Sequence, residues 1–111
     1  MSLKESNSGR GITEKKEILK QLGDIPEDIY DEIVHGFYEE TRERLKLISE
    51  YISSLNWSAI ARAAHGIKGS SANLRLFEIQ AIAEGLQGAA ESNDPDMVKK
   101  LADQLKPLIP D

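Results

Sequence analysis

The chain has no cysteine and few aromatic residues. Phe, Trp and Tyr together make up 5% of its 111 residues. Without cysteine it can form no disulfide, no cysteine-ligated zinc site and no thiol nucleophile, which fits a reducing compartment. With so few aromatic side chains, aliphatic residues and alanines must fill the core.

Long apolar runs and an excess of positive charge are also absent. The longest apolar runs are far too short to span a membrane, and no signal-peptide core is visible. The formal net charge of -5 disfavours nucleic acid or an anionic membrane surface as the main partner. With 40% hydrophobic and 30% charged residues, the composition indicates one small soluble domain, which we expect in the cytoplasm.

Helical periodicity covers most of the chain. A short pattern at 13–23, with Thr13 as its cap and Gly23 at its end, precedes four longer patterns at 25–55, 57–74, 76–92 and 96–109. No segment keeps a strand period. We therefore predict an all-α fold, an antiparallel up-down four-helix bundle with a short extra N-terminal helix. It occupies residues 13–111, after a polar lead-in or linker at residues 1–12 that we expect to be disordered.

Helix start signals support these boundaries. Pro26 suits a first helical position, Asn56 is a good N-cap, and Asp94 followed by Pro95 forms a cap and first turn. Gly36 is expected to weaken or bend its helix locally.

The apolar stripes of these helices predict the core. On the second helix we expect Ile29, Ile33, Phe37, Leu45, Ile48, Ile52 and Leu55 to be buried. On the third we expect Ile60, Ala64, Ile67, Ser71 and Leu74, and on the fourth Ile79, Ile82, Ala83, Leu86 and Ala90.

The stretch "AHGIKGSSANL", residues 64–74, places a glycine and two serines inside the third helix. At about 100° per residue, Ala61, His65, Lys68, Gly69 and Ala72 share one flank beside the core stripe. Gly69 costs roughly 0.5–1 kcal/mol of helix stability relative to alanine, but it leaves the surface beside the imidazole clear. Lys68 lies one turn from the ring and supplies a cation. This arrangement suits an exposed imidazole that receives an anionic group while a partner protein covers it.

Other chemistry is poorly supported by the sequence. His35 has no lysine three residues on, and we interpret it as structural or incidental. Ser70 and Ser71 have no acid placed to complete a nucleophilic triad. Two histidines on different helices make a poor ligand set, so we predict no metal site. Trp57 is interpreted as a packing residue near a helix start.

The segment "HGIKGSSANLRLFEIQAIAEGLQ", residues 65–87, resembles the core motif of histidine-containing phosphotransfer (HPt) domains of phosphorelays. The family motif is a histidine, two variable residues, Lys-Gly and two small residues, followed by a small-residue and leucine run and a second helix. The resemblance is specific over 65–87, and the helical pattern from about 13 to 110 fits the family fold. One position departs from it, because Arg75 stands where the family commonly has a glycine, near the turn between two helices.

The resemblance implies a role for each matching residue. His65 matches the phosphoryl acceptor, Lys68 the lysine that balances phosphate charge or aids docking, and Gly69 the glycine that clears the approach. Ser70 matches the next small position. Gln87 matches a position that hydrogen-bonds the imidazole nitrogen that is not phosphorylated, which leaves Nε2 as the nucleophile.

The implied function is reversible phosphoryl transfer between His65 and an aspartate of a response-regulator receiver domain, with a hybrid histidine kinase as a further candidate partner. No nucleotide-binding motif occurs, so we expect a carrier with no kinase activity and no cofactor of its own, and Mg²⁺ on the receiver. Leu76 or Phe77 is a candidate for the rim of the interface.

Two alternatives remain. A plain helical interaction or scaffold module would explain the bundle but not Lys68 and Gly69 beside His65. A dimerising kinase helix pair usually has an acid directly after its histidine, whereas this chain has Gly66 there.

Overall fold

The computed structural model describes residues 15–110, and every regular element in this range is helical. Residues 15–21 are helical, and the α-helices α2 (Glu27–Ser53), α3 (Trp57–Asn73), α4 (Phe77–Glu91) and α5 (Pro95–Leu105) follow, with a 3₁₀ turn η1 at Lys106–Leu108. The predicted all-α helical bundle is confirmed. Thr13 and the lead-in at 1–12 lie outside the described residues.

The chain divides into two compact units, Met1–Val34 and His35–Asp111, and the boundary falls within α2. In the described part of the first unit, Gly23 ends the first helix with φ at +90°. Lys15 pairs with Glu27 at 2.8 Å and with Asp31 at 2.9 Å, which ties the first helix to the start of α2. Tyr30 is buried there.

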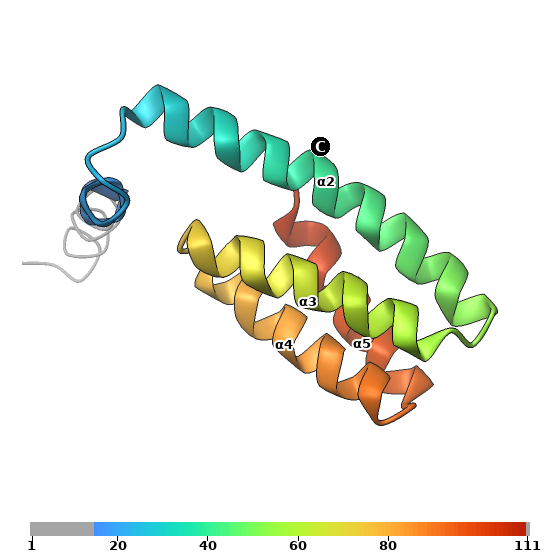
Figure 1. Ribbon diagram of the computed structural model, residues 1–111. Coiled ribbons are helices and arrows are strands. Elements are labelled where there is room, and N and C mark those ends of the chain that lie inside the picture. Colours follow the sequence, from blue (N-terminus) through green and yellow to red (C-terminus); the bar gives the residue numbers. More distant parts are fainter. Residues whose placement is uncertain (1–14, 111) are drawn as a thin grey trace, which may run out of the picture. The chain divides into compact units, whose positions relative to one another are not determined.

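In the second unit α3, α4 and α5 follow one another through tight turns, so neighbouring helices run antiparallel and lie side by side (Figure 1). Asn56 caps α3 by accepting a hydrogen bond from the Ala59 amide at 3.2 Å. Asp94 caps α5 in the same way through Met97, and Pro95 opens the helix. Both hydrogen bonds confirm the predicted caps. A cap can be predicted from the sequence because it depends only on its own turn.

The C-terminal end returns to α2, where the guanidinium of Arg42 donates a hydrogen bond to the carbonyl of Pro110 (Figure 1). The fifth helix is shorter than predicted as an α-helix. It ends at Leu105 and tightens into η1, because Pro107 has no amide hydrogen to continue the helical ladder. Gly36 does not interrupt α2, which is continuous from Glu27 to Ser53.

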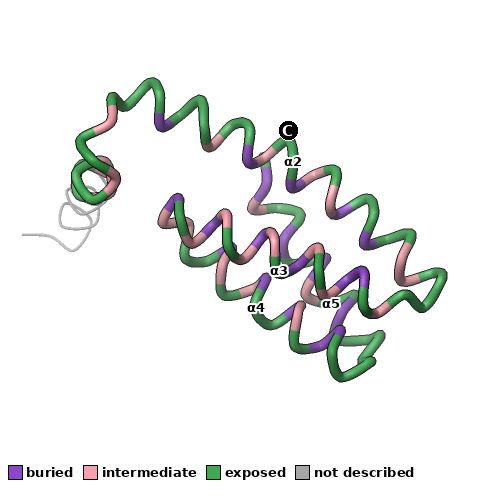
Figure 2. The backbone as a smooth tube through the Cα atoms, viewed as in Figure 1, coloured by how far each residue is buried: buried purple, intermediate pink, exposed green. Residues whose placement is uncertain are grey.

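Figure 2 shows where the buried residues of the second unit lie along its helices. The predicted stripe on α3 is buried at every position, and so are Ile79, Ala83, Leu86 and Ala90 on α4, whereas Ile82 is only half-buried. α5 adds Val98, Ala102 and Leu105. Apart from Phe37, Thr41 and Ser71, the buried residues of the second unit are aliphatic side chains and alanines, in keeping with the scarcity of aromatic residues.

The prediction for α2 was partly wrong. Phe37, Leu45 and Ile48 are buried and Ile52 is half-buried, but Ile29, Ile33 and Leu55 are 42%, 48% and 67% exposed. One residue rotates the helix by about 100°, so the burial of Tyr30 leaves its neighbour Ile29 facing outward. Leu55 lies after the helix end, in the turn. Thr41 is polar and was not among the predicted core residues, but it is fully buried between Phe37 and Leu45 on the same face.

No helix within residues 15–110 is long and apolar enough to cross a membrane.

Candidate functional site

His65 lies on the exposed side of α3, at the middle of the helix. The core stripe holds α3 by its opposite side, with Ile60, Ala64 and Ile67 fully buried. Because this buried stripe fixes the rotation of α3 about its axis, the imidazole of His65 faces outward. An exposed histidine on a buried, capped helix is a reactive group on a rigid support.

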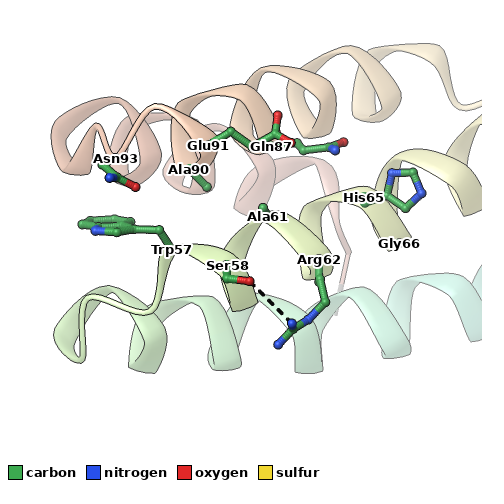
Figure 3. A pocket seen from close by; sticks show the side chains of 10 residues that line it. All are labelled: Trp57, Ser58, Ala61, Arg62, His65, Gly66, Gln87, Ala90, Glu91 and Asn93. Carbon is green, nitrogen blue, oxygen red and sulfur yellow. Dashed lines mark hydrogen bonds between the residues drawn. The ribbon is translucent and has the colours of Figure 1, made fainter.

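A groove of about 720 Å³ runs between α3 and α4 beside His65 (Figure 3). Residues of α3 form one wall, and α4 with the turn after it forms the other. Its lining is Trp57, Ser58, Ala61, Arg62, His65, Gly66, Gln87, Ala90, Glu91 and Asn93. The structure thus brings three predicted site residues, His65, Gln87 and Ala61, to one groove.

Gln87 extends from α4 along the groove toward the ring of His65 (Figure 3). Its Oε1 atom is buried and has no hydrogen-bond partner among the described residues. A buried carbonyl oxygen without a partner is costly, and such an atom is a ready acceptor for a donor brought beside it. The N–H of the His65 ring is a donor at the same end of the groove.

The predicted residues Lys68, Gly69, Ser70 and Ala72 do not line this groove. Lys68, Ser70 and Ala72 are half-buried, and Gly69 is exposed. A Cβ added at Gly69 would meet no atom within 4 Å, so the surface one turn after His65 is open. Ser70 is about 140° around the helix from His65 and lies on another side of α3.

Ser71 uses its hydroxyl within its own helix. The buried Oγ donates to the carbonyl of Ile67 at 2.7 Å, and it lies 3.0 Å from the carbonyl of Lys68. This hydroxyl is therefore satisfied by the backbone and is not a donor for a ligand.

Arg75 adopts the backbone conformation that a glycine would favour at its position. Its φ is +62°, and the amide of Leu76 donates to the carbonyl of Ser71 at 2.9 Å, which closes the end of α3. The Arg75 side chain also donates to the carbonyl of Ala72 at 3.0 Å. The departure from the family pattern therefore leaves the turn in the form that glycine would give it.

Arg44 is a neighbour of the site that sequence reasoning missed. Its Nη2 pairs with Glu40 at 2.8 Å, and its guanidinium would lie 3.1 Å from a Cβ added at Gly66, the residue after His65. Gly66 therefore lets α2 approach α3 directly behind the histidine. Nothing in the local pattern of α3 signals this contact, because Arg44 is 22 residues away in the chain.

Trp57 lies half-buried at the start of α3, at the far end of the groove from His65 (Figure 3). Its place in the groove wall adds to the packing role that the sequence predicts. The available signal was its spacing, since Trp57, Ala61 and His65 follow at intervals of four residues, which places them on one side of a helix.

The remaining candidates lie elsewhere. His35 is exposed on α2 and pairs with Glu39 at 2.9 Å, outside the groove. Leu76 and Phe77 line a separate hollow with Ile79 and Leu108, so they are not at the edge of the His65 groove. Within residues 15–110, no group of three or more histidine or carboxylate side chains is placed to hold a metal ion.

The fold and the groove define a helical-bundle protein that presents one exposed histidine beside an open cleft between two helices. The family model of the Hpt domain matches residues 32–109, which is more than half of the chain. The chain belongs to the Hpt domain family, whose members carry phosphoryl groups on histidine in phosphorelays. Comparison with curated proteins and with solved structures gives no significant match.

Proposed function

We propose that this chain is a phosphoryl carrier whose acceptor is His65, and that it exchanges the phosphoryl group with an aspartate of a response-regulator receiver domain. The observation that carries the proposal is the position of His65, exposed on a rigid helix and beside the unpartnered Oε1 of Gln87. The family match to residues 32–109 supports the same chemistry.

The transfer balances as a substitution at phosphorus. The lone pair of His65 Nε2 forms the N–P bond while the bond from phosphorus to the aspartate oxygen breaks, and the carboxylate leaves with the electron pair. The proton on Nδ1 stays on the ring, and this N–H donates a hydrogen bond to Gln87 Oε1. The reverse step returns the phosphoryl group to a carboxylate. Because the transition state is loose, positioning and charge neutralisation supply most of the catalysis.

Charge neutralisation is divided between the two proteins. Lys68, one turn after His65, places its ammonium on the same flank of α3 and balances phosphoryl charge or aids docking. The receiver supplies Mg²⁺ and its own acidic cluster, so we expect no cofactor on this chain. Because Gly69 and Ala72 are small, they leave room for the partner protein to approach the imidazole of His65. The role also implies that the chain acts in the cytoplasm with receivers or with a hybrid histidine kinase.

The decisive experiment is phosphoryl transfer from a panel of phosphorylated receivers to wild type, His65→Gln and His35→Gln. His35 is the matched control, because it is also an exposed histidine on a helix. We expect acid-labile, base-stable label on wild type and on His35→Gln, and none on His65→Gln. Since His65 is exposed, its replacement should leave the helical circular dichroism spectrum unchanged.

The alternative outcome points to a scaffold. If the folded wild type takes no label from any receiver, or if His65→Gln labels as well as wild type, the carrier assignment fails. A helical interaction module then becomes the better account. Gln87→Ala refines the assignment: losing one hydrogen bond to the ring, worth roughly 1.4 kcal/mol, should slow transfer about tenfold while His65 remains the labelled residue.

A further inference from the structure

The groove has a second end, away from His65. There the ring of Trp57 and the side chain of Asn93 stand opposite His65 and Gln87, with Ala61 and Ala90 between the two ends (Figure 3). We call the space bounded by Trp57, Ala61, Ala90 and Asn93 the Trp57 hollow. Ala90 is fully buried, and Trp57 and Ala61 are half-buried, so the floor of the hollow is apolar and built into the fold.

A protein interface of ordinary size that is centred on His65 also covers this hollow. Trp57 precedes His65 by eight residues, which is about 12 Å along the helix axis. The phosphorus of the receiver's aspartyl phosphate has to approach the imidazole nitrogen to about 3 Å. A specific interface covers about 800 Å² on each partner, so it extends well beyond 12 Å from a central histidine.

The chemistry of the hollow favours an apolar side chain as its occupant. Its floor presents two methyl groups and its end wall presents an indole. The rim is polar and exposed, with Ser58 and Arg62 on the α3 side and Glu91 on the α4 side. Arg62 is directed toward Ser58, with its Nη1 atom 3.5 Å from the Ser58 Oγ (Figure 3). An apolar centre with a tryptophan and a polar rim is the usual anatomy of an interface hot spot.

We propose that the Trp57 hollow receives an apolar side chain of the receiver domain that exchanges its phosphoryl group with His65, and that the fit of this side chain selects among receivers. The inference rests on the proposed function, because it takes the receiver as the occupant. His65 then supplies the chemistry common to every partner, and the hollow supplies the discrimination between them.

The test fills the hollow and leaves the histidine in place. Ala61→Leu replaces a methyl group of the floor with an isobutyl group, and leucine is a good helix former, so α3 should remain folded. Ala81→Leu is the matched control, because Ala81 is exposed on α4 and does not line the groove. Each variant is labelled by a phosphorylated receiver and, separately, by phosphoramidate, a small donor that needs no docking surface.

The readout is the ratio of receiver transfer, as kcat/KM, to the rate of phosphoramidate labelling. We expect this ratio to fall about tenfold or more in Ala61→Leu, as it does when a hot-spot contact is lost. It should not change in Ala81→Leu. An unchanged ratio in Ala61→Leu would overturn the inference, and so would an equal loss of both labels, since the substitution would then act on His65 itself.

Binding can be followed independently through Trp57, the single tryptophan of the chain. A receiver without tryptophan, added unphosphorylated, should shift the Trp57 emission to shorter wavelength as the indole is covered. The shift should saturate, and Ala61→Leu should need about tenfold more receiver to reach the midpoint.

The two proposals fail in different ways. If wild type takes label from receivers but Trp57 emission does not respond to them, the hollow is not part of the interface and the carrier function stands. If no phosphorylated receiver labels wild type, the carrier function fails, and the hollow loses its proposed occupant with it.

Discussion

Gly66 and Gly69 are three residues apart on α3, yet the space beside them differs. A Cβ at Gly69 would enter open space, whereas a Cβ at Gly66 would lie 3.1 Å from the guanidinium of Arg44. Both glycines cost helix stability, but only Gly66 is required by a neighbouring side chain. Substitutions at Gly69 therefore report the helix propensity of the residue alone, whereas substitutions at Gly66 also report the packing of Arg44 behind the histidine.

We expect Gly69→Ala to raise the free energy of unfolding by roughly 0.5–1 kcal/mol, because alanine restricts the unfolded chain and favours the helix. Gly66→Ala should raise it by less, or lower it, because the methyl displaces Arg44 from its pair with Glu40. Urea unfolding of both variants measures the difference. Equal gains at the two positions would show that Arg44 yields without cost.

At the scale of the element, three helices of the second unit end in the same way. Leu55, Arg75 and Asn93 each have φ between +54° and +62°. In each case the next amide donates to the carbonyl five residues earlier, at 2.9 to 3.0 Å, and that next residue is the N-cap of the following helix. The bundle thus uses one turn geometry three times, and none of the three left-handed positions holds a glycine.

Leu55→Gly should stabilise the protein by about 1 kcal/mol, because an L-residue in the left-handed region costs roughly 1–2 kcal/mol that glycine avoids. Leu55 is 67% exposed, so its removal loses little burial. Thermal or urea unfolding checks the value. A destabilised variant would mean that the leucine side chain contributes more packing than its exposure indicates.

The first helix is joined to α2 by charge. The carboxylates of Glu27 and then Asp31 hydrogen-bond the Lys15 ammonium and raise the pKa of Lys15 from 10.5 to about 12. A raised lysine pKa means that the folded state favours the protonated form. The stabilisation is therefore complete below pH 10.5 and is lost as the pH rises through about 12.

Lys15→Met should accordingly unfold at lower temperature than wild type below pH 10.5, and the difference should close as the pH passes about 12. Circular dichroism melts of the two proteins across this range provide the measurement. A difference that persists above the raised pKa would assign the effect to the aliphatic stem of the lysine.

At the scale of the whole molecule, the groove and the helices that form it lie in the unit His35–Asp111. The family match begins at residue 32, inside α2. Every side chain that lines the groove therefore belongs to the unit His35–Asp111.

Deletion of residues 1–26, which removes the chain before α2, should leave phosphoryl acceptance by His65 within about twofold of wild type. Twofold is less than half a kcal/mol and within the usual effect of a distant change. Phosphoramidate labelling, scored beside the helical circular dichroism signal, tests this. Loss of labelling with full helical content would show that the first unit contributes to the site.

Local sequence patterns predict the helices, their starts and the outward face of α3. Caps such as Asn56 and Asp94 act within one turn, and the stripe that sets the direction of His65 is periodic in the chain, so both can be predicted from neighbouring residues. The resemblance over residues 65–87 also implied the family, which the match to residues 32–109 shows.

The side of α2 that is buried, the need for glycine at position 66 and the course of the groove follow from the packing of the helices and are not predictable from local patterns. Thr41 rather than Ile33 enters the core, Arg44 packs on Gly66, and Trp57 shares a hollow with Ala90. Each of these facts joins residues far apart in the chain, or depends on the partner that a helix face meets. A local pattern predicts neither the long-range contact nor the partner of a helix face, because periodicity fixes which residues share a face but not what packs against it.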